Sequence, residues 1–341
     1  MKKIILGMIV LTFFVFLIPI LFSSPFIIKD NEEAENRDND IQVDAVETFD
    51  YGKINMIKLL IVSTGEIKEI HLDEYIKGVV ASEMPAEYHE EALKTQALVA
   101  RSYTLNKLEN NSGVILPEHN GADMCDNYSH CQAWISKEER LSKWPEENRE
   151  EYWSKISLSV DSTKGEIITY NSKVINALFH ANSGGKTESS VDVWGGVLPY
   201  IQVVETISEN DYSQYSSRVE LNKEDFLTKL KEKYSQFEID FNSENCIKIT
   251  EYTDGGRVRS VNMGNITLSG IDVRTIFELK SANFIVNVNG DNIIFEVTGY
   301  GHGVGMSQTG ANTLAKQGKN YKEIIQYYYK DVNVEQVNTI R

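Results

Sequence analysis

A glutamate at the end of an apolar helical stripe is the first residue that could do acid–base chemistry. Ile76, Val79, Val80 and Glu83 follow the i, i+3, i+4, i+7 spacing of one helix face, and Pro85 must end that helix. A carboxyl group held against such neighbours has its ionised form disfavoured, which suits a general acid near neutral pH. The alternative is a helix-end glutamate that leans into solvent or pairs with a neighbouring cation.

Two histidines and two cysteines lie within thirteen residues of one another, in the order His-x5-Cys-x4-His-Cys. They are His119, Cys125, His130 and Cys131. Two sulfurs and two imidazole nitrogens suit tetrahedral zinc, and four protein ligands leave no position for an activated water. The spacing therefore predicts one structural zinc ion per chain. The alternative is a disulfide between Cys125 and Cys131, which an oxidising compartment would permit.

Two glycine-rich segments, 181–188 and 300–308, each follow a predicted strand. Glycines permit close approach of a ligand to the backbone, and neighbouring hydroxyl, imidazole and amide groups offer directional hydrogen bonds. Neither segment has the lysine and serine spacing of a phosphate loop. We expect six of their residues to contact a sugar or to orient Glu83: Ser183, Gly184, Thr187, His302, Ser307 and Gln308. Trp134, Trp144, Trp153 and Trp194 could add apolar faces for sugar rings, although core packing is the commoner use.

Strand and helix patterns are mixed along the chain without regular alternation, which predicts an α+β fold. Hairpins are expected over 57–72 and 165–180 and a strand pair at 284–288 and 293–297. Helices are expected from Asp73 to Pro85 and over 87–108, 224–234 and 321–328. We expect two unequal lobes with an active-site cleft between them. The catalytic lobe would comprise 51–204 and 291–341, and a smaller inserted lobe would comprise 205–290.

The charge balance and the N-terminus narrow the class of protein. The 341 residues carry 34 basic and 50 acidic side chains, a net charge of −16, which argues against a nucleic-acid binder. An apolar run follows Lys2 and Lys3 and is long enough to cross a bilayer, so residues 1–28 are predicted to be a single-pass membrane anchor with the body outside. Residues 29–50 read as an acidic, disordered tether. The alternative for the first segment is a cleaved signal peptide.

Several segments together resemble the family of stage II sporulation protein D, peptidoglycan lytic transglycosylases of endospore-forming bacteria. The matching segments are 75–85, 91–103, 183–188, 257–258, Arg274 and 300–311, the last reading YGHGVGMSQTGA. The resemblance implies that Glu83 is the catalytic acid. It implies cleavage of the β-1,4 bond between N-acetylmuramic acid and N-acetylglucosamine in peptide-free strands, leaving a 1,6-anhydro end. Such chemistry needs one acid/base group, and Glu87 and Glu188, the nearest second carboxylates, have no context that argues for them.

The resemblance also implies a biological setting. The histidine and cysteine cluster matches the zinc-binding pattern of clostridial-type members. Stage II sporulation protein P, an amidase, and stage II sporulation protein M, a membrane protein, are the implied partners. The body would face the space between mother cell and forespore during engulfment. Because the chain is acidic, we expect lactyl carboxylates of the glycan to be held by local hydrogen bonds and aromatic contacts.

Two other functions remain open from the sequence. The same superfamily includes amidase enhancers, which bind cell wall and stimulate a partner enzyme without cutting glycan. A zinc hydrolase acting on amide bonds would need an open metal position and a nearby base.

Overall fold

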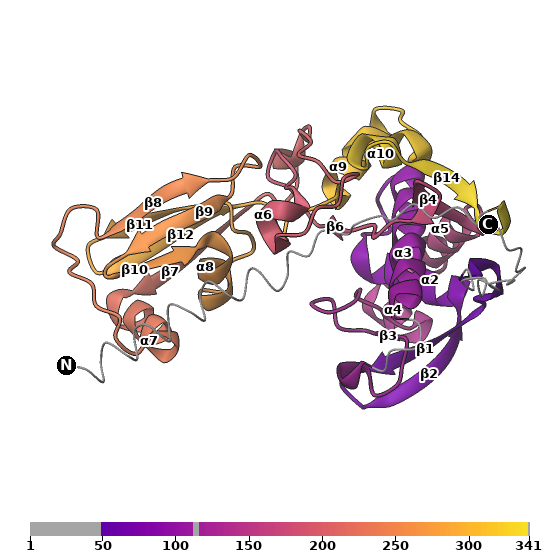
Figure 1. Cartoon of the computed structure of the whole chain (residues 1–341). Coiled ribbons are helices and arrows are strands. Elements are labelled where there is room, and N and C mark those ends of the chain that lie inside the picture. The colour runs from indigo at the N-terminus through magenta and orange to yellow at the C-terminus, as the bar shows by residue number, and fades with distance from the viewer. Residues whose placement is uncertain (1–48, 112–115, 340–341) are drawn as a thin grey trace, which may run out of the picture. The chain divides into compact units, whose positions relative to one another are not determined.

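The computed structural model describes residues 49–111 and 116–339 (Figure 1). The expected anchor at 1–28 lies outside the described residues, and so does the expected tether apart from residues 49 and 50. Within the described ranges no helix is both long and apolar enough to cross a membrane.

Helices and short strands are mixed along the described chain, which confirms the α+β class. The helices are α2 (Leu72–Glu83), α3 (Glu90–Asn110), α4 (Lys137–Lys143), α5 (Arg149–Asp161), α6 (Ser190–Trp194), α7 (Lys223–Lys233), α8 (Gly270–Ile276), α9 (Gln308–Lys316) and α10 (Tyr321–Tyr328). The strands are β1 (Met56–Ile61), β2 (Glu66–His71), β3 (Met124–Cys125), β4 (Glu166–Tyr170), β5 (Lys173–Val174), β6 (Phe179–His180), β7 (Ser216–Asn222), β8 (Ile247–Tyr252), β9 (Val258–Met263), β10 (Ile266–Ser269), β11 (Phe284–Asn289), β12 (Asn292–Thr298), β13 (Met306–Ser307) and β14 (Asn333–Gln336).

The larger of two hydrophobic cores is organised around α3. This helix packs against α2, α5, α9 and α10, so helices from both ends of the described chain meet on it (Figure 1). Two small sheets flank the helices, with strand orders β2-β1-β3 and β14-β4-β5. In the second sheet the C-terminal strand β14 is antiparallel to β4. Residues near both ends of the described chain, such as Tyr51 and Val334, therefore pack in or against the same core.

Helix α2 presents the apolar stripe that its sequence predicts. Ile76, Val79 and Val80 are fully buried, and the helix ends at Glu83, two residues before Pro85. Its start differs from the expectation, because His71 is the N-cap residue and its Nδ1 accepts from the Asp73 backbone N–H at 3.3 Å. Asp73 therefore lies in the first helical turn, where the helix dipole favours its negative charge.

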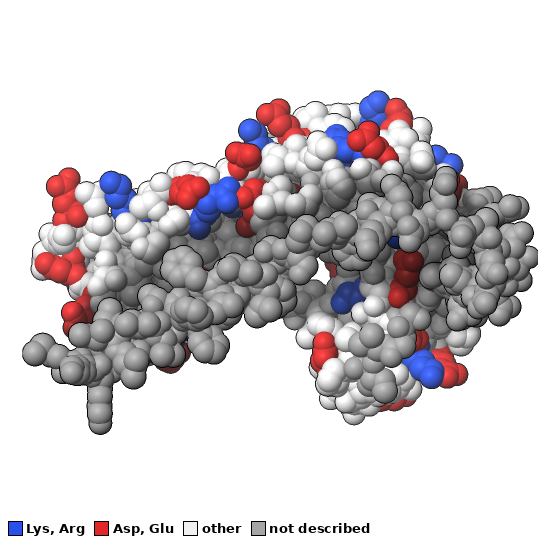
Figure 2. Space-filling view, viewed as in Figure 1, with Lys and Arg blue, Asp and Glu red and all other residues white. Residues whose placement is uncertain are grey.

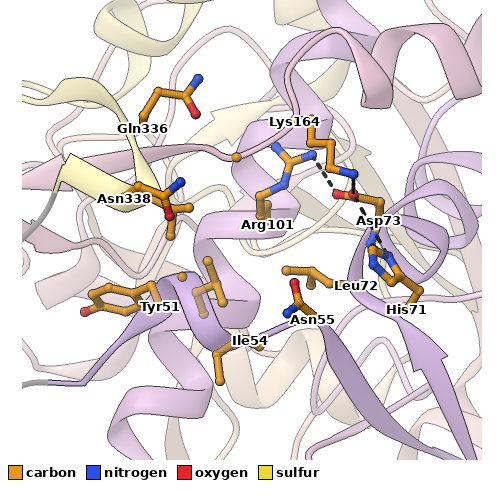
Figure 3. A pocket seen from close by; sticks show the side chains of 14 residues that line it. Tyr51, Ile54, Asn55, His71, Leu72, Asp73, Arg101, Lys164, Gln336 and Asn338 are labelled. Atoms are coloured by element: carbon orange, nitrogen blue, oxygen red, sulfur yellow. Dashed lines mark hydrogen bonds and ion pairs between the residues drawn. The ribbon is translucent and has the colours of Figure 1, made fainter.

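The Asp73 carboxylate takes part in a polar cluster (Figure 3). It lies 3.7 Å from the Arg101 guanidinium and 3.2 Å from Lys164 Nζ. Arg101 is almost fully buried in α3 and donates to the carbonyl oxygens of Thr163 and Glu166 at 2.8 and 3.2 Å. A buried guanidinium needs such partners, and here they hold α2, α3 and the turn before β4 together.

The smaller core is built from residues 216–298 and is rich in phenylalanine. Strands β10-β9-β8 and β11-β12-β7 form its two sheets, and α7 and α8 complete it. The rings of Phe226 and Phe277 stack at 5.0 Å, and Phe277 and Phe295 meet at 4.9 Å. Aromatic pairs at such distances add stability beyond the area that they bury.

Both expected boundaries of the inserted lobe, 205 and 290, differ from this second core. Strand β12 pairs with both β7 and β11. The turn at Asn289–Gly290 is therefore the tip of the β11–β12 hairpin, and a boundary at 290 would divide two hydrogen-bonded strands. Residues 205–215 also fall outside the second core, since Glu209 bonds to the glycine-rich segments described below.

Candidate functional site

The Glu83 carboxylate is half-buried at the C-terminal end of α2 and makes two hydrogen bonds. Its Oε1 accepts from the Ala133 backbone N–H at 2.9 Å, and its Oε2 accepts from the Gln308 amide Nε2 at 3.3 Å. Burial raises the pKa of Glu83, and the two hydrogen bonds offset this only in part. The carbonyl end of the helix dipole disfavours the anion as well. The group therefore has the character of an acid that keeps its proton at higher pH than an ordinary glutamate.

Both hydrogen-bond donors to Glu83 are held by other parts of the larger core. Gln308 is the first residue of α9, and its Nε2 also lies 3.4 Å from Gln96 Oε1 on α3. Ala133 lies between Gln132, whose amide donates to Thr104 Oγ1 at 3.0 Å, and Trp134, which packs on α2. A Cβ atom on Gly78 of α2 would overlap this indole, so a glycine is needed there for the segment to approach the helix.

The predicted metal ligands converge. The four donor atoms of His119, Cys125, His130 and Cys131 all lie within 4.8 Å of one another. His119 Nε2 and His130 Nδ1 are 2.9 Å apart. Cys131 Sγ lies 3.4 Å from His119 Nε2 and 3.7 Å from His130 Nδ1, and Cys125 Sγ lies 3.5 Å from His130 Nδ1. In a tetrahedral zinc site with bonds of about 2.0–2.3 Å, neighbouring ligand atoms are roughly 3.3–3.8 Å apart. The sulfur–nitrogen distances fall in this range, and the two imidazole nitrogens would have to move slightly apart, so the residues fit the metal after a small movement.

The surroundings of the cluster also fit a metal site. His130 Nε2 lies 3.3 Å from the Glu118 carboxylate, which is the usual arrangement behind a metal-bound histidine. Lys107 Nζ donates to the His130 carbonyl oxygen at 3.0 Å. Cys125 and Cys131 are free thiols, so the structure does not contain the alternative disulfide. Ala133 follows the last ligand by two residues, so the same loop that carries the cluster carries a donor to Glu83.

The two glycine-rich segments lie side by side and share a carboxylate that the sequence did not single out. Asn182 bridges to Tyr300, and Glu188 bridges to Val304. Glu209, 2% exposed, accepts six hydrogen bonds at this junction. The donors are the Ser183 N–H and hydroxyl, the Gly185 N–H and the hydroxyls of Thr206, Ser307 and Thr309. Burial opposes ionisation of Glu209, but these donors outweigh it and lower its pKa.

Three of the expected sugar contacts are therefore buried structural groups. Ser183 and Ser307 are fully buried and donate their hydroxyls to Glu209. Thr187 is also fully buried, donates to the Gln202 carbonyl at 3.2 Å and accepts from a backbone N–H. The expectation of direct sugar contact does not fit these three residues, because the sequence shows that hydroxyls are present but not which partner they face.

The other three expected residues have different positions. Gln308 contacts Glu83, as one of the two expected roles requires. Gly184 has a φ of 73°, a left-handed conformation, and the Cβ atom of any other residue there would lie 3.0 Å from the Thr298 side chain. His302 accepts at Nδ1 from the Val304 N–H at 3.0 Å, and its ring lies 5.1 Å from that of Trp194. Burial and the charges of Arg274 and Arg257 lower the pKa of His302 to about 3, so the ring is neutral.

Arg257 joins the second core to both glycine-rich segments. It is 3% exposed and donates to the carbonyl oxygens of Ser183 and Lys186 at 3.0 and 3.1 Å. A Cβ atom on Gly303, whose φ is 85°, would overlap its guanidinium. Glu188, a candidate second carboxylate, lies 3.9 Å from Arg257 and accepts from Thr253 Oγ1 at 2.6 Å. The Glu188 carboxylate thus interacts with Thr253 and Arg257 rather than with Glu83.

Charged side chains of both signs occur on the surface of the described residues. Figure 2 shows acidic and basic side chains interspersed over the described part of the visible face, without a continuous basic area. A protein that follows a phosphate backbone normally presents such an area.

Comparison with known proteins gives consistent matches. A family model described as Stage II sporulation protein matches residues 62–170. Stage II sporulation protein D of Bacillus subtilis (strain 168) is 33% identical over 346 residues, covering 99% of this chain and 97% of the relative. The protein of the same name from Bacillus amyloliquefaciens is 32% identical and covers 81% of this chain and 78% of the relative. An amidase enhancer of Bacillus subtilis (strain 168) is 27% identical over 74% of this chain but only 39% of its own length. The near-complete coverage by the first relative shows that the chain belongs to the stage II sporulation protein D family.

Proposed function

We propose that this protein is a lytic transglycosylase that cuts peptide-free peptidoglycan strands during sporulation, with Glu83 as its acid/base group. The observation that carries the proposal is the environment of Glu83. Its carboxyl group is half-buried at a helix C-terminus, has a raised pKa and is fixed at both oxygens by neutral donors, Ala133 N–H and Gln308 Nε2. A general acid requires a proton at working pH and a fixed orientation; the raised pKa favours the first, and the two hydrogen bonds provide the second.

The reaction uses the Glu83 carboxyl group twice, first as an acid and then as a base. Protonated Glu83 donates to the oxygen of the β-1,4 bond as the bond to C1 of N-acetylmuramic acid breaks. The Glu83 carboxylate then takes the proton from the C6 hydroxyl of the same sugar while O6 bonds to C1. The products are an N-acetylglucosamine end and a 1,6-anhydro-N-acetylmuramic end, and no water is consumed.

Glu188 and Glu209, two buried carboxylates near the glycine-rich segments, are engaged in other contacts, which supports a mechanism with a single acid/base group. Ordinary glycosidases place two carboxyl groups across the scissile bond, one as acid and one as base or nucleophile. Here Glu188 bonds to Thr253 and lies beside Arg257, and Glu209 accepts six hydrogen bonds from the glycine-rich junction. An intramolecular C6 hydroxyl needs no second carboxylate.

We assign the histidine and cysteine cluster to one structural zinc ion per chain. His119, Cys125, His130 and Cys131 would fill a tetrahedral shell, and zinc bound in this way cross-links the loop rather than activating water. Ala133, which follows this cluster, would then be held in place to donate to Glu83.

The biological setting rests on the family and on the N-terminal sequence. We propose a single-pass anchor at 1–28 with the body on the outer side of the mother-cell membrane, facing the forespore. Stage II sporulation protein P would supply peptide-free glycan as the amidase, and stage II sporulation protein M would be the membrane partner.

A direct test incubates the purified protein with peptide-free glycan and analyses the ends by mass spectrometry. The wild-type protein should release 1,6-anhydro-N-acetylmuramic ends. Glu83→Gln should reduce that rate by about 10²–10⁴-fold, the usual contribution of a positioned general acid. Glu87→Gln, which alters an exposed carboxylate four residues away, is the matched control and should keep the wild-type rate. Absence of anhydro ends with the folded wild-type protein would reject the lyase.

The second candidate is a non-catalytic amidase enhancer, because one of the relatives carries that name. An enhancer would bind the same glycan, leave its ends unchanged and raise the turnover of an added amidase. Its effect on the amidase would survive Glu83→Gln, whereas a lyase activity would not. The two functions therefore separate in one experiment with the wild-type protein and this variant.

A further inference from the structure

A small cavity of about 190 Å³ lies where the glycine-rich segments meet the second core. Its wall includes Trp194 at the end of α6, His302, and Arg274 on α8. Drug-sized ligands usually occupy pockets of about 300–1,000 Å³, so a cavity of this size suits one substituted sugar and not a long oligosaccharide. Glu83 is not among the lining residues, so the cavity is separate from the proposed acid.

The charges that line the cavity do not cancel. Arg259 lies 2.7 Å from Asp192, and Arg257 lies 3.9 Å from Glu188, so two of the three arginines have an acidic partner. Arg274 has none within 4.0 Å among residues 49–111 and 116–339, although its Nε donates to the Leu279 carbonyl oxygen at 3.3 Å. That bond fixes the guanidinium while leaving its charge without an acid. Among the described residues, Arg274 is thus the one arginine of this cavity that no carboxylate contacts, whereas Arg259 also lies 3.0 Å from Glu251.

The exposed ring of Trp194 lines the same cavity as Arg274. Trp194 is 54% exposed, whereas Trp144 and Trp153 are both 8% exposed. Its indole lies against the neutral His302 ring at 5.1 Å, and Gly195 follows it in a left-handed turn with a φ of 74°. A large apolar ring that is held in place and open to solvent is suited to packing on the face of a pyranose.

We propose that this cavity is a subsite for an N-acetylmuramic residue, in which Arg274 binds the free lactyl carboxylate and Trp194 packs on the sugar ring. A guanidinium presents paired N–H donors that match a carboxylate, and such charge-assisted bonds are among the strongest in proteins. The proposal rests on the proposed glycan substrate and specifies how it is recognised. It adds an ionic contact to the local hydrogen bonds and aromatic contacts that the sequence led us to expect for the lactyl carboxylates.

The subsite would give the protein a means to select peptide-free glycan. When a stem peptide is attached, the lactyl group is a neutral amide and offers no negative charge to Arg274. When the peptide has been removed, the free carboxylate pairs with it. The discrimination would come from one arginine that is not paired with any carboxylate of residues 49–111 and 116–339.

The test measures binding in the full chain, purified in detergent and carrying Glu83→Gln so that cleavage does not intervene. The ligands are fluorescent peptide-free glycan oligosaccharides and the same oligosaccharides with their carboxylates converted to N-methylamides. We expect the carboxylate form to bind about 10- to 100-fold more tightly. Adding Arg274→Gln should bring the two dissociation constants together, and Arg274→Lys, which keeps the charge, should retain part of the preference. Adding Trp194→Ala should weaken both ligands by a similar factor.

Arg218→Gln is the matched control, because Arg218 is an exposed arginine on β7 that pairs with Glu220 at 2.8 Å. It should leave both dissociation constants unchanged. A preference of the original size in Arg274→Gln protein would overturn the subsite, as would equal binding of the two ligands before Arg274 is changed. Because the readout is binding, loss of the lyase hypothesis would appear only in the cleavage assay, so the two failures are distinguishable.

Discussion

Glu83 and Glu209 are two carboxylates of the same chain whose surroundings shift their pKa values in opposite directions. Glu83 receives two hydrogen bonds, and burial raises its pKa. Glu209 is more completely buried, but six donors surround it and its pKa is lowered. Burial alone therefore does not decide the protonation of an acid; the number of donors that remain with the anion decides it.

Because of this difference in hydrogen-bond donors, Glu83 can exchange a proton more readily than Glu209. Glu209 is held as an anion that ties Ser183, Gly185 and Ser307 together, and giving it a proton would break several of those bonds. Glu83 loses little by taking a proton, because its two donors are neutral and few. The glycine-rich junction is thus held together by an ionised carboxylate, whereas the carboxyl group at the end of α2 gains or loses a proton at little structural cost.

Removing the predicted metal should loosen the Glu83 region and spare the Glu209 region. We expect about one zinc ion per chain by elemental analysis, and Cys125→Ser should lower the free energy of unfolding by about 4 kcal/mol as the metal is lost. Hydrogen exchange should accelerate at the Ala133 amide, the donor to Glu83, much more than at the Gly185 amide, the donor to Glu209.

Cys246→Ser is the control for that experiment, since Cys246 is outside the cluster and half-exposed. It should retain the metal and the wild-type melting temperature. A Cys125→Ser protein that keeps its stability yet loses all activity would instead indicate a catalytic metal.

Glu209→Gln should damage the fold, in contrast to Glu83→Gln. An amide oxygen and an amide NH₂ cannot accept all six hydrogen bonds, so we expect a loss of about 3 kcal/mol in urea denaturation. Because the pKa of Glu209 is lowered by folding, its contribution is present above the unfolded-state pKa and is lost as the pH falls through the folded-state value. The variant should therefore show a smaller loss of stability on acidification than the wild-type protein.

Glu205→Gln tests the specificity of this effect, because the Glu205 side chain is 82% exposed and lies 3.8 Å from Lys186. It should change stability by less than about 0.5 kcal/mol. Equal losses in the two variants would mean that the six hydrogen bonds contribute no special stability.

Gln308→Ala should widen the difference between the pKa values of Glu83 and Glu209. The Gln308 amide favours the anionic form of Glu83, so its loss should raise the pKa of Glu83 and move the alkaline limb of the activity profile to higher pH. We also expect kcat/KM to fall about tenfold, because one of two bonds that orient the carboxyl group is gone.

Gln317→Ala, at an exposed position just after α9, is the comparison for this variant. It should leave both the rate and the pH profile unchanged. An alkaline limb that stays in place in Gln308→Ala protein would show that Glu83 is not the group that the profile reports.

The smallest expected effect is a gain in stability from Glu83→Gln near neutral pH. The folded-state pKa of Glu83 is raised, so ionisation above the unfolded-state pKa costs the folded protein free energy as the pH increases. The glutamine variant lacks that cost and should therefore be slightly more stable than the wild-type protein at pH 7. Below the ordinary glutamate pKa the two proteins should have the same stability, and a destabilised variant at pH 7 would contradict the assigned direction.

The chain sequence by itself determined the local features of this protein. The stripe of Ile76, Val79 and Val80 specified the buried face of α2, and Pro85 specified where the helix stops, because both depend on residues a few positions apart. The metal-ligand cluster was visible for the same reason, since all four ligands lie within thirteen residues. The hairpin at Asn289–Gly290 was also visible from the sequence. Its second strand, β12, also pairs with β7, which is distant in sequence, and the expected boundary at 290 therefore lies inside a sheet.

Only the tertiary structure decided which polar groups face one another. Ala133 donates to Glu83 across 50 positions of sequence, and Gln308 does so across 225. Glu209 gathers Ser183 and Ser307 from 26 and 98 positions away, which turns two expected sugar contacts into buried donors. Residue type and spacing report the chemistry that a side chain can perform within its own helix or loop. The protonation and partner of a buried group depend on the dielectric and the donors around it, and these exist only once distant segments have packed together.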